Sequence, residues 1–364
     1  MFLRNTWYIA AWDRELGDKP LAVRVLGEDI VLYRQSDGSP AALEDACPHR
    51  KLPLSLGRIQ GDHLECGYHG LTFDCSGSCV KVPGMNQIPP GARVRAYPLH
   101  ARYGLLWIWM GEVQRADPAT IHQTPHWDDP DWGCNQGEAI EMACNYLHIT
   151  DNLLDPSHVS WVHQGSFGNA ACEDTLMDTT VADNGVTVSR WMRNVEPAPF
   201  YVPFLKFTGN CDRKQQYEVR FPSHAYIKAI FVPAGTGGDD RPLHPDGFIM
   251  DSYNFMTPVD ETHTRYYWFQ MRNFAPGDAD ISRQFTASVR FAFAEDKVIL
   301  EAVQKGIDRA AVPPIGLKID LGPTRFRRAM AQLITEEQLQ VQAQAQAHAQ
   351  AGARTIAIHP EQVA

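Results

Sequence analysis

The chain has 364 residues, of which 44% are hydrophobic and 21% are charged, so it is long enough for two domains that each bury a core. Its net charge of -10 argues against a nucleic-acid-binding protein, because binding to a polyanion requires concentrated Lys and Arg. No apolar run is long enough to cross a membrane, and the first residues lack the pattern of a secretory signal. We therefore expect a cytoplasmic protein that binds neither nucleic acid nor a membrane.

The first 111 residues predict an all-β domain. Short segments with alternating apolar residues at 22–26, 30–33 and 105–109 are separated by Gly, Pro, Asp and Asn, which is typical of strands joined by turns. Residues 1–111 carry 12 Lys and Arg against 11 Asp and Glu. The N-terminal domain is therefore close to neutral, and the negative charge lies in the rest of the chain.

Two pairs of Cys and His lie within this domain. Cys47-x-His49 and Cys66-x-x-His69 are separated by sixteen residues, and each pair sits in a segment rich in Gly or Pro. A Rieske [2Fe–2S] cluster takes one such pair from each of two loops, with two thiolates on one iron and two imidazoles on the other. A structural zinc site is the alternative, although zinc half-sites usually pair two cysteines. Cys75 and Cys79 could extend this group, but a lone Cys in a β-rich domain is usually a small buried hydrophobe, so we expect both to be structural. The four remaining cysteines have no paired ligand spacing, and we expect the same of them.

Residues 112–140 predict a linker, since Pro, Asp, His and Trp dominate them. Residues 141–330 predict an α+β domain that starts with a helical stretch at 141–163 and ends in a helix from about residue 281. Between these helices, alternation predicts strands at 187–191, 225–232 and 264–270. Residues 331–364, which include an Ala/Gln-rich run, predict a peripheral C-terminal helix or tail without an assigned function.

A second group of candidate ligands lies in the helical stretch. His158 and His163 are five residues apart, and Asp155-Pro156 before them suits the start of a helix, with Asp as N-cap and Pro at the first position. Five residues turn an ideal helix by about 140°, so the two imidazoles converge only if the helix ends near His163. The following Gln-Gly permits such an end. This stretch alone leaves a metal site and an ordinary helix start equally open.

Asp296 lies on the apolar face of the downstream helix. On a helical wheel that face also holds Val289, Phe293, Leu300, Val303 and Ile307, whereas Glu295 and Lys297 lie outside it. An unpaired carboxylate on an apolar face is costly, so it should be paired, protonated or bound to a metal. Two histidines and one carboxylate form the facial triad of non-haem Fe(II) oxygenases. The alternative is an ion pair with Arg265 or Arg272.

The two groups in this order resemble the oxygenase component of the Rieske non-haem iron oxygenases. The two Cys/His pairs match its cluster motif, and residues 293–297 resemble the segment that supplies its carboxylate ligand. Its catalytic motif is matched by Asn152-x-x-Asp155-x-x-His158-x4-His163. The chain is most similar to the aromatic-acid branch, which includes vanillate O-demethylases, toluenesulfonate methyl-monooxygenases and dicamba O-demethylases. The resemblance implies an all-β Rieske domain over residues 1–111, followed by an α+β, helix-grip-like catalytic domain with an antiparallel sheet.

The resemblance also implies one Rieske [2Fe–2S] cluster and one mononuclear Fe(II) per chain. His158, His163 and Asp296 would bind the iron, and Asn152 would lie near it. In this family the oxygenase forms a ring, usually a homotrimer, in which His69 of one subunit hydrogen-bonds Asp155 of the next. Asp155 in turn bonds His158, so that it bridges the two iron centres.

A separate reductase is implied as the electron donor. It would carry flavin and a ferredoxin-type [2Fe–2S] centre and draw on NADH, which agrees with the lack of a Gly-x-Gly-x-x-Gly nucleotide motif in this chain. Arg50, Lys51 and Arg58 flank the cluster ligands and are candidates for docking an acidic ferredoxin domain. Ordinary solvated charges are an equally open explanation for these three residues.

The implied reaction is the hydroxylation of a methoxy or methyl group of an aromatic acid by O₂, with release of formaldehyde from a methoxy group. Lys228 and Asn254 correspond in position to polar residues that bind the acid group in this branch. For Lys228, a solvent-facing place on its strand is equally open. Two other functions also stay open: a dioxygenase that cis-dihydroxylates the ring of an aromatic acid, and a Rieske electron carrier without chemistry of its own.

Overall fold

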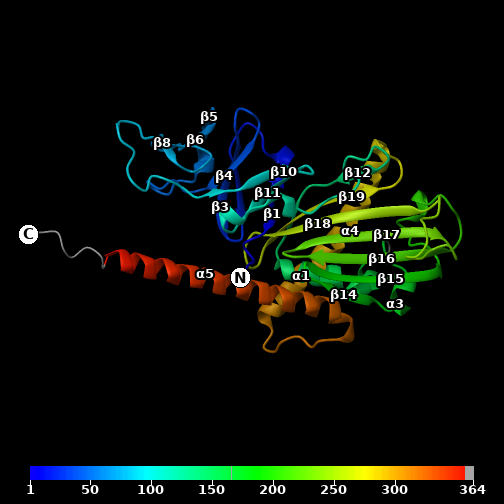
Figure 1. The fold of residues 1–364 in the computed structure, drawn as a ribbon. Coiled ribbons are helices and arrows are strands. Elements are labelled where there is room, and N and C mark those ends of the chain that lie inside the picture. Colours follow the sequence, from blue (N-terminus) through cyan, green and yellow to red (C-terminus); the bar gives the residue numbers. More distant parts are fainter. Residues whose placement is uncertain (165, 357–364) are drawn as a thin grey trace, which may run out of the picture.

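The computed structural model describes residues 1–164 and 166–356, and it contains three small antiparallel sheets followed by one large one (Figure 1). The small sheets have the strand orders β1-β11-β10, β2-β3-β4-β9 and β5-β6-β7-β8. Their strands are β1 (Trp7–Trp12), β2 (Leu21–Val25), β3 (Glu28–Arg34), β4 (Pro40–Glu44), β5 (Arg58–Gln60), β6 (His63–Glu65), β7 (Thr72–Phe73), β8 (Cys79–Lys81), β9 (Ala96–Tyr97), β10 (Leu99–Arg102) and β11 (Leu105–Trp109). The N-terminal part of the chain is thus all-β, as predicted.

The large sheet has eight antiparallel strands in the order β12-β19-β18-β17-β16-β15-β14, with β13 also paired to β19. The strands are β12 (Gly133–Gln136), β13 (Ile140–Met142), β14 (Asp178–Ala182), β15 (Gly185–Val195), β16 (Cys211–Arg220), β17 (His224–Pro233), β18 (Phe248–Pro258) and β19 (Thr264–Arg272). The helices are α1 (Tyr146–Leu154), α2 (Val159–Val162), α3 (Ala171–Asp174), α4 (Ala279–Arg309) and α5 (Leu321–Ile356). The C-terminal part is therefore the expected α+β domain with an antiparallel sheet.

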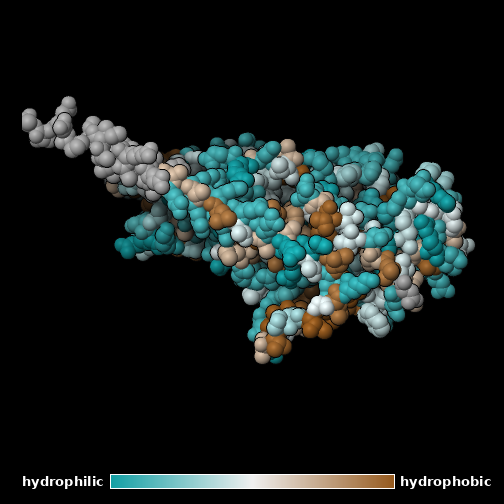
Figure 2. Space-filling view, turned by 60° about the horizontal axis from the view of Figure 1, so that its bottom comes forward, coloured by the Kyte–Doolittle hydropathy of each residue, from teal (hydrophilic) through white to brown (hydrophobic). Residues whose placement is uncertain are grey.

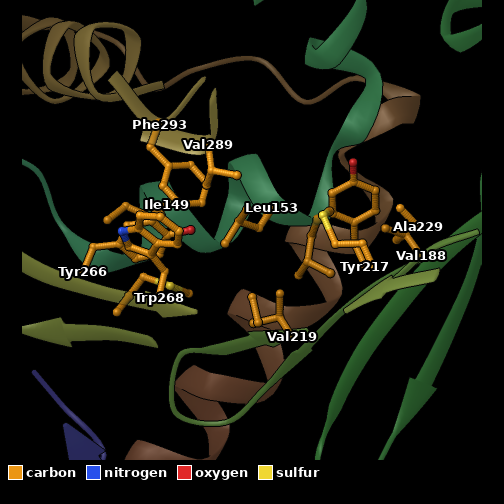
Figure 3. Packing of buried hydrophobic residues seen from close by; sticks show 14 of the residues in the cluster. Ile149, Leu153, Val188, Tyr217, Val219, Ala229, Tyr266, Trp268, Val289 and Phe293 are labelled. Atoms are coloured by element: carbon orange, nitrogen blue, oxygen red, sulfur yellow. The ribbon is translucent and has the colours of Figure 1, made fainter. Parts of the chain in front are cut away.

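One face of the large sheet packs on α1, α4 and α5. Strand alternation turns every second side chain of β15 to β19 toward these helices, where the side chains meet apolar residues of α1 and α4 (Figure 3). The labelled side chains of this core are Ile149, Leu153, Val188, Tyr217, Val219, Ala229, Tyr266, Trp268, Val289 and Phe293.

The other face of the sheet is covered at one end by the small sheet that contains β1 and β11. Trp7, Trp12 and Trp107 pack there against Tyr267 and other aromatic side chains of β18 and β19. The Thr257 hydroxyl donates a 2.8 Å hydrogen bond to the backbone carbonyl of Ile9 in β1. Because the aromatic packing between the two sheets is buried, it fixes the N-terminal part of the chain against the large sheet.

Several elements differ from the sequence-based expectation. The segment 112–140, expected to be a linker, contains β12 and the start of β13, because residues 133–136 and 140–142 pair with β19. The helical stretch at 141–163 is divided into α1, a 3₁₀ turn at Pro156–His158, and α2.

The buried face of α4 and the first residue of α5 also differ from the prediction. On α4, Val303 and Ile307 are exposed, and Gln304 is buried instead because its side chain accepts a hydrogen bond from the Asn145 backbone N–H. Helix α5 begins at Leu321 rather than near residue 331, and it buries Phe326 and Met330. Among the described helices, none is long and apolar enough to cross a membrane.

Candidate metal centres

The break between α1 and α2 brings two histidines to the same side. Helix α1 stops at Leu154 because Pro156 cannot continue it, and the Asp155 carboxylate accepts a 3.1 Å hydrogen bond from the Ser157 backbone N–H as cap of the next turn. Helix α2 ends at Val162. With the chain turned at both points, the imidazole rings of His158 and His163 lie with their centroids 5.4 Å apart.

Asp296 of α4 completes a cluster of three potential metal ligands. One ligand atom each of His158, His163 and Asp296 lies within 4.8 Å of the others. The Asp296 Oδ1 is 3.2 Å from Nε2 of His163 and 3.7 Å from Nε2 of His158. The three residues that the sequence singled out for the mononuclear iron are therefore together in the structure.

Each imidazole is oriented by a hydrogen bond through its other nitrogen. Nδ1 of His158 lies 2.6 Å from the backbone carbonyl of Asp155, and Nδ1 of His163 lies 2.9 Å from Oε2 of Glu295. Because both partners are acceptors, both Nδ1 atoms carry a proton, which leaves the two Nε2 lone pairs directed at the space beside Asp296. This is the orientation that a metal site requires.

The charge balance of the cluster also fits a bound cation. Burial lowers the pKa of His158, and Asp296 only partly opposes this effect. Burial acts in the same direction on His163, yet the pKa of His163 is raised because Asp296 and Glu295 together outweigh it. The carboxylates of Asp296 and Glu295 thus stabilise positive charge beside the Nε2 atoms of the two histidines. A divalent metal ion supplies that charge in place of a proton.

The ion pair considered as an alternative for Asp296 does not occur among the described residues. Arg265 pairs with Glu15 and Glu141, and Arg272 donates to the side chains of Asn135 and Ser282. Asp296 instead accepts a 3.3 Å hydrogen bond from the Asn152 side-chain amide. Asn152 therefore lies beside the cluster and orients its carboxylate.

A mostly apolar pocket opens onto the three ligands. Its walls include Leu153, Ile227, Met250 and Phe293, which is suitable for a flat, apolar ring. Polar groups enter it at the sheet side from Tyr201, Tyr217, Ser252 and Gln270. The pocket is thus apolar over most of its wall and polar at one side.

The two residues predicted to bind the substrate's acid group do not line this pocket. Lys228 follows Ile227 in β17, so strand alternation turns it to the opposite face of the sheet, where its Nζ is 3.4 Å from Asp251. Asn254 is fully buried and accepts a 3.0 Å hydrogen bond from the Tyr266 hydroxyl. Their placement corrects the expectation for both: Lys228 has the wrong strand phase, and Asn254 is engaged inside the core.

Glu295 is a site residue that the sequence did not reveal. It precedes Asp296 on α4 and lies outside the apolar face, because neighbouring residues on a helix point about 100° apart. Helical periodicity singles out a carboxylate inside the apolar face, such as Asp296, and does not single out Glu295 at its edge. The signal in the sequence that could have revealed Glu295 is its position directly before Asp296, since two adjacent acidic residues can both reach one histidine.

The two Cys/His loops have the same backbone conformation. In each loop the Cys backbone N–H donates to the residue five positions later, Leu52 at 2.9 Å and Leu71 at 2.8 Å. The residue at the fourth position donates back to the Cys carbonyl and has a positive φ, 59° for Lys51 and 72° for Gly70. The loops between β4 and β5 and between β6 and β7 are therefore matching halves of one site.

The four side chains divide into a buried and an exposed pair. Cys47 and Cys66 are buried, and burial together with the neighbouring Cys66 raises the pKa of the Cys47 thiol. His49 and His69 are exposed, with ring centroids 4.5 Å apart. The thiols lie inside and the imidazoles at the surface, as a cluster that exchanges electrons through its histidines requires.

The spacing of these ligands disfavours a single zinc ion. Zinc–ligand bonds of about 2.0–2.3 Å in a tetrahedron bring the ligand atoms within roughly 3–4 Å of each other. Within the described residues, the only three His, Cys, Asp or Glu ligand atoms that approach within 4.8 Å of one another are those of the His158, His163 and Asp296 group. No three of the four Cys/His ligand atoms approach this closely, which disfavours one shared zinc ion.

The three basic residues next to these loops differ in their surroundings. Arg50 and Lys51 are exposed, whereas the exposed side chain of Arg58 forms an ion pair with Glu65. Arg50 and Lys51 form no ion pair with another described residue, so they present positive charge beside His49.

Comparisons with known proteins agree with this division. Residues 6–98 match the Rieske [2Fe-2S] domain, and residues 142–336 match the vanillate O-demethylase oxygenase C-terminal domain. The chain is 37% identical to a putative toluene-4-sulfonate monooxygenase iron-sulfur subunit of Comamonas testosteroni, over 93% of this chain and 98% of that protein. It is 36% identical to a vanillate O-demethylase oxygenase subunit of Pseudomonas sp. (strain HR199 / DSM 7063), over 93% and 96% of the two chains. A crystal structure of dicamba monooxygenase bound to dicamba superposes with a TM-score of 0.84 at 30% identity, over 93% and 99% of the two chains.

Proposed function

The chain belongs to the Rieske non-haem iron oxygenases of the vanillate O-demethylase type, and from this we propose that it is the terminal oxygenase component of a monooxygenase. Its substrate is an aromatic acid with a methoxy or methyl group, and its reaction is the hydroxylation of that group. The observation that carries the proposal is the buried cluster of His158, His163 and Asp296 at one side of an apolar pocket.

In the proposed reaction, the chain's residues hold two metal groups and the substrate. Cys47, His49, Cys66 and His69 would hold a [2Fe–2S] cluster, which would supply electrons one at a time, and His158, His163 and Asp296 would hold an Fe(II), which would supply the activation of O₂. For a methoxyarene the balance is ArOCH₃ + O₂ + 2 e⁻ + 2 H⁺ → ArOH + HCHO + H₂O.

The pocket residues orient the ring and keep water away from the reacting group. Leu153, Met250 and Phe293 provide apolar walls, and Asn152 and Glu295 fix the directions of Asp296 and His163.

We place the transfer of electrons between subunits of a ring, most simply a homotrimer. The strands β5, β6 and β8 that frame the cluster loops lie at the end of the molecule away from β15 to β17 (Figure 1). The Asp155 side chain caps the turn that holds His158 through one oxygen, Oδ1, and no hydrogen bond to Oδ2 occurs within the described residues. Oδ2 of Asp155 is therefore available to His69 of a neighbouring subunit.

Exposed apolar side chains support this assembly. Tyr68 and Met85 surround His69 on the Rieske side, and Trp161, 70% exposed, lies six residues after Asp155 on the catalytic side. Hydrophobic side chains are also at the surface of the projecting segment between α4 and α5, including Val312 and Ile315 (Figure 2). Two different apolar faces suit the head-to-tail contacts that close a ring.

The electron donor that we propose is a reductase with flavin and a ferredoxin-type [2Fe–2S] centre that oxidises NADH. Arg50 and Lys51 next to the exposed His49 would attract its acidic surface, and Arg58 contributes less because Glu65 neutralises it.

Product analysis tests the proposed reaction. Methoxy- and methylbenzoates and toluenesulfonate are incubated with the oxygenase, O₂ and a surrogate reductase. Formaldehyde or a benzylic alcohol supports the proposal, whereas a cis-diol would assign the chain to the ring dioxygenases.

Iron analysis tests the alternative of an electron carrier. We expect three irons per chain, and two in Asp296→Ala with an unchanged cluster spectrum and no turnover. Two irons in the unmodified protein and no O₂-dependent product would identify a carrier.

A further inference from the structure

The pocket-facing side of the large sheet holds three buried arginines without a carboxylate partner. Arg190 in β15, Arg213 in β16 and Arg272 in β19 are 4%, 1% and 0% exposed, and none forms an ion pair within the described residues. Strand alternation puts them on the face that also carries Tyr217 and Gln270. A buried guanidinium without a counter-ion is costly, so an anion that binds near these arginines is stabilised by their charge.

Two of these cations lie together behind one end of the pocket. Arg213 donates to the Phe167 carbonyl at 2.8 Å and to Sγ of Cys172 at 3.6 Å, and its Nε has no partner. Arg190 donates to the Cys172 carbonyl at 2.6 Å. Cζ of Arg213 is 5.4 Å from the ring centroid of Tyr201, which lines the pocket. The positive charge therefore stands directly behind a pocket wall.

Tyr201 and Tyr217 both line the pocket, and neither hydroxyl donates a hydrogen bond to another described residue. Figure 3 shows the Tyr217 hydroxyl directed away from Val188 and Ala229. Burial raises the pKa of Tyr201 to about 12, although Arg213 acts in the opposite direction, so the phenol keeps a proton to donate at neutral pH.

We propose that the acid group of the aromatic substrate binds at the Tyr201 and Tyr217 end of the pocket, with Arg213 and Arg190 providing the charge that selects an anion. This rests on the function proposed above, which it deepens by naming the residues that choose the substrate class. The phenols donate hydrogen bonds to the carboxylate or sulfonate. The group to be oxidised then points to His158 and His163, which line the same pocket.

The electrostatics of the pocket favour this orientation over the reverse. The sheet side carries buried positive charge from Arg213 and Arg190, while the helix side carries the carboxylates of Asp296 and Glu295. An anionic group is attracted to the first side, and the attraction is strong where water is excluded, whereas a bound Fe(II) would balance the two carboxylates of the second side. A neutral ester of the same shape does not gain this attraction.

Binding affinity tests the proposal without requiring turnover. Dissociation constants of 3- and 4-methoxybenzoate, toluene-4-sulfonate and the matching methyl esters or sulfonamide are measured by titration calorimetry with the purified oxygenase. We expect each acid to bind more tightly than its neutral partner. Tyr201→Phe and Tyr217→Phe should each weaken binding of the acids about tenfold and change binding of the neutral compounds by less than about twofold.

Two further variants give the control and the direct test of charge. Lys228→Ala, on the other face of the sheet, should leave all affinities unchanged. Arg213→Met should remove the preference for acids, and circular dichroism reports whether it folds; if it does not, the two Tyr→Phe variants decide. The proposal is overturned if acids and neutral partners bind equally, if the Phe variants weaken both alike, or if Lys228→Ala alone abolishes the preference.

The outcome also separates this site from the proposed function. Formaldehyde release with equal affinity for acid and ester would remove the anion site and leave the oxygenase. Selective binding of acids without any O₂-dependent product would retain the anion site and remove the oxygenase.

Discussion

The imidazole of His163 lies between two carboxylates that serve it in different ways. Asp296 lies beside Nε2 of His163, and Glu295 accepts a 2.9 Å hydrogen bond from its Nδ1. A carboxylate at Nδ1 fixes the ring and makes Nε2 a better donor to a metal. Glu295 is therefore expected to determine how tightly iron is held, although it does not touch the metal position.

Replacing Glu295 tests this role. We expect Glu295→Ala to lower the affinity for Fe(II) by about 10- to 100-fold, and Glu295→Gln to lower it less because the amide oxygen still accepts the Nδ1 proton. Iron content after dialysis against graded Fe(II) concentrations measures the effect. The exposed Glu336→Gln on α5 is the control, and equal iron affinity in all four proteins would contradict the role.

At the scale of residues, the sequence revealed those whose chemistry conflicts with their surroundings. Asp296 was predictable because a carboxylate inside an apolar helix face needs a partner. Lys228 was misplaced because a single strand segment does not tell which of its two faces covers the pocket. The paired buried cations Arg190 and Arg213 were not found, since only the strand register brings them together.

At the scale of elements, the segment from α2 to α3 depends on close backbone packing. The Gly168 backbone N–H donates to the His163 carbonyl at 2.9 Å, and a Cβ at Gly168 would lie 2.1 Å from the Val159 carbonyl oxygen. Any side chain there must push apart the turn that positions His163.

We therefore expect Gly168→Ala to destabilise the fold by about 1–3 kcal/mol and to weaken iron binding as well. Thermal unfolding followed by circular dichroism and iron content measure the two effects. Gly17→Ala is the control, because a Cβ at Gly17 meets no atom within 4 Å. A normal melting temperature and full iron content in Gly168→Ala would refute the packing argument.

The beginning of α5 belongs to the core, whereas residues 341–347 of the same helix are exposed. Phe326 and Met330 are buried in the main core cluster, and the Glu337 carboxylate accepts hydrogen bonds from the backbone N–H groups of Arg4 and Asn5. We expect Phe326→Ala to cost about 3–5 kcal/mol of stability, and removal of residues 342–364 to leave the melting temperature unchanged. Denaturation curves compare the two proteins, and a large loss on truncation would show that the tail supports the fold.

The elements of the sheet were easier to predict than the connections between them. Strands β15, β17 and β19 were apparent from alternation, because each has one face in the core. Strand β12 was missed since a short strand rich in polar residues has no alternating pattern, and only pairing with β19 defines it. The break at Asp155-Pro156 was visible in the sequence, but the 3₁₀ turn that aligns the histidines was not.

At the scale of the whole molecule, we propose that the cluster of one subunit delivers electrons to the iron site of another. A chain with Cys47→Ser lacks the cluster, and a chain with Asp296→Ala lacks the mononuclear iron, so each alone is inactive. We expect mixed oligomers of the two to regain part of the activity, because the intact cluster of one subunit faces the intact iron site of its neighbour. Mixed oligomers verified by differential tagging that stay inactive would contradict transfer between subunits.

The central claim is that electrons from the Cys47/Cys66 cluster are used at the His158, His163 and Asp296 site. The most direct test reduces the cluster chemically in the absence of O₂, then adds O₂ with a methoxylated aromatic acid, and follows cluster reoxidation by absorbance together with formaldehyde. We expect rapid reoxidation with formaldehyde in the unmodified protein, and a cluster that stays reduced, without formaldehyde, in Asp296→Ala. Reoxidation at the same rate in both proteins would contradict this claim.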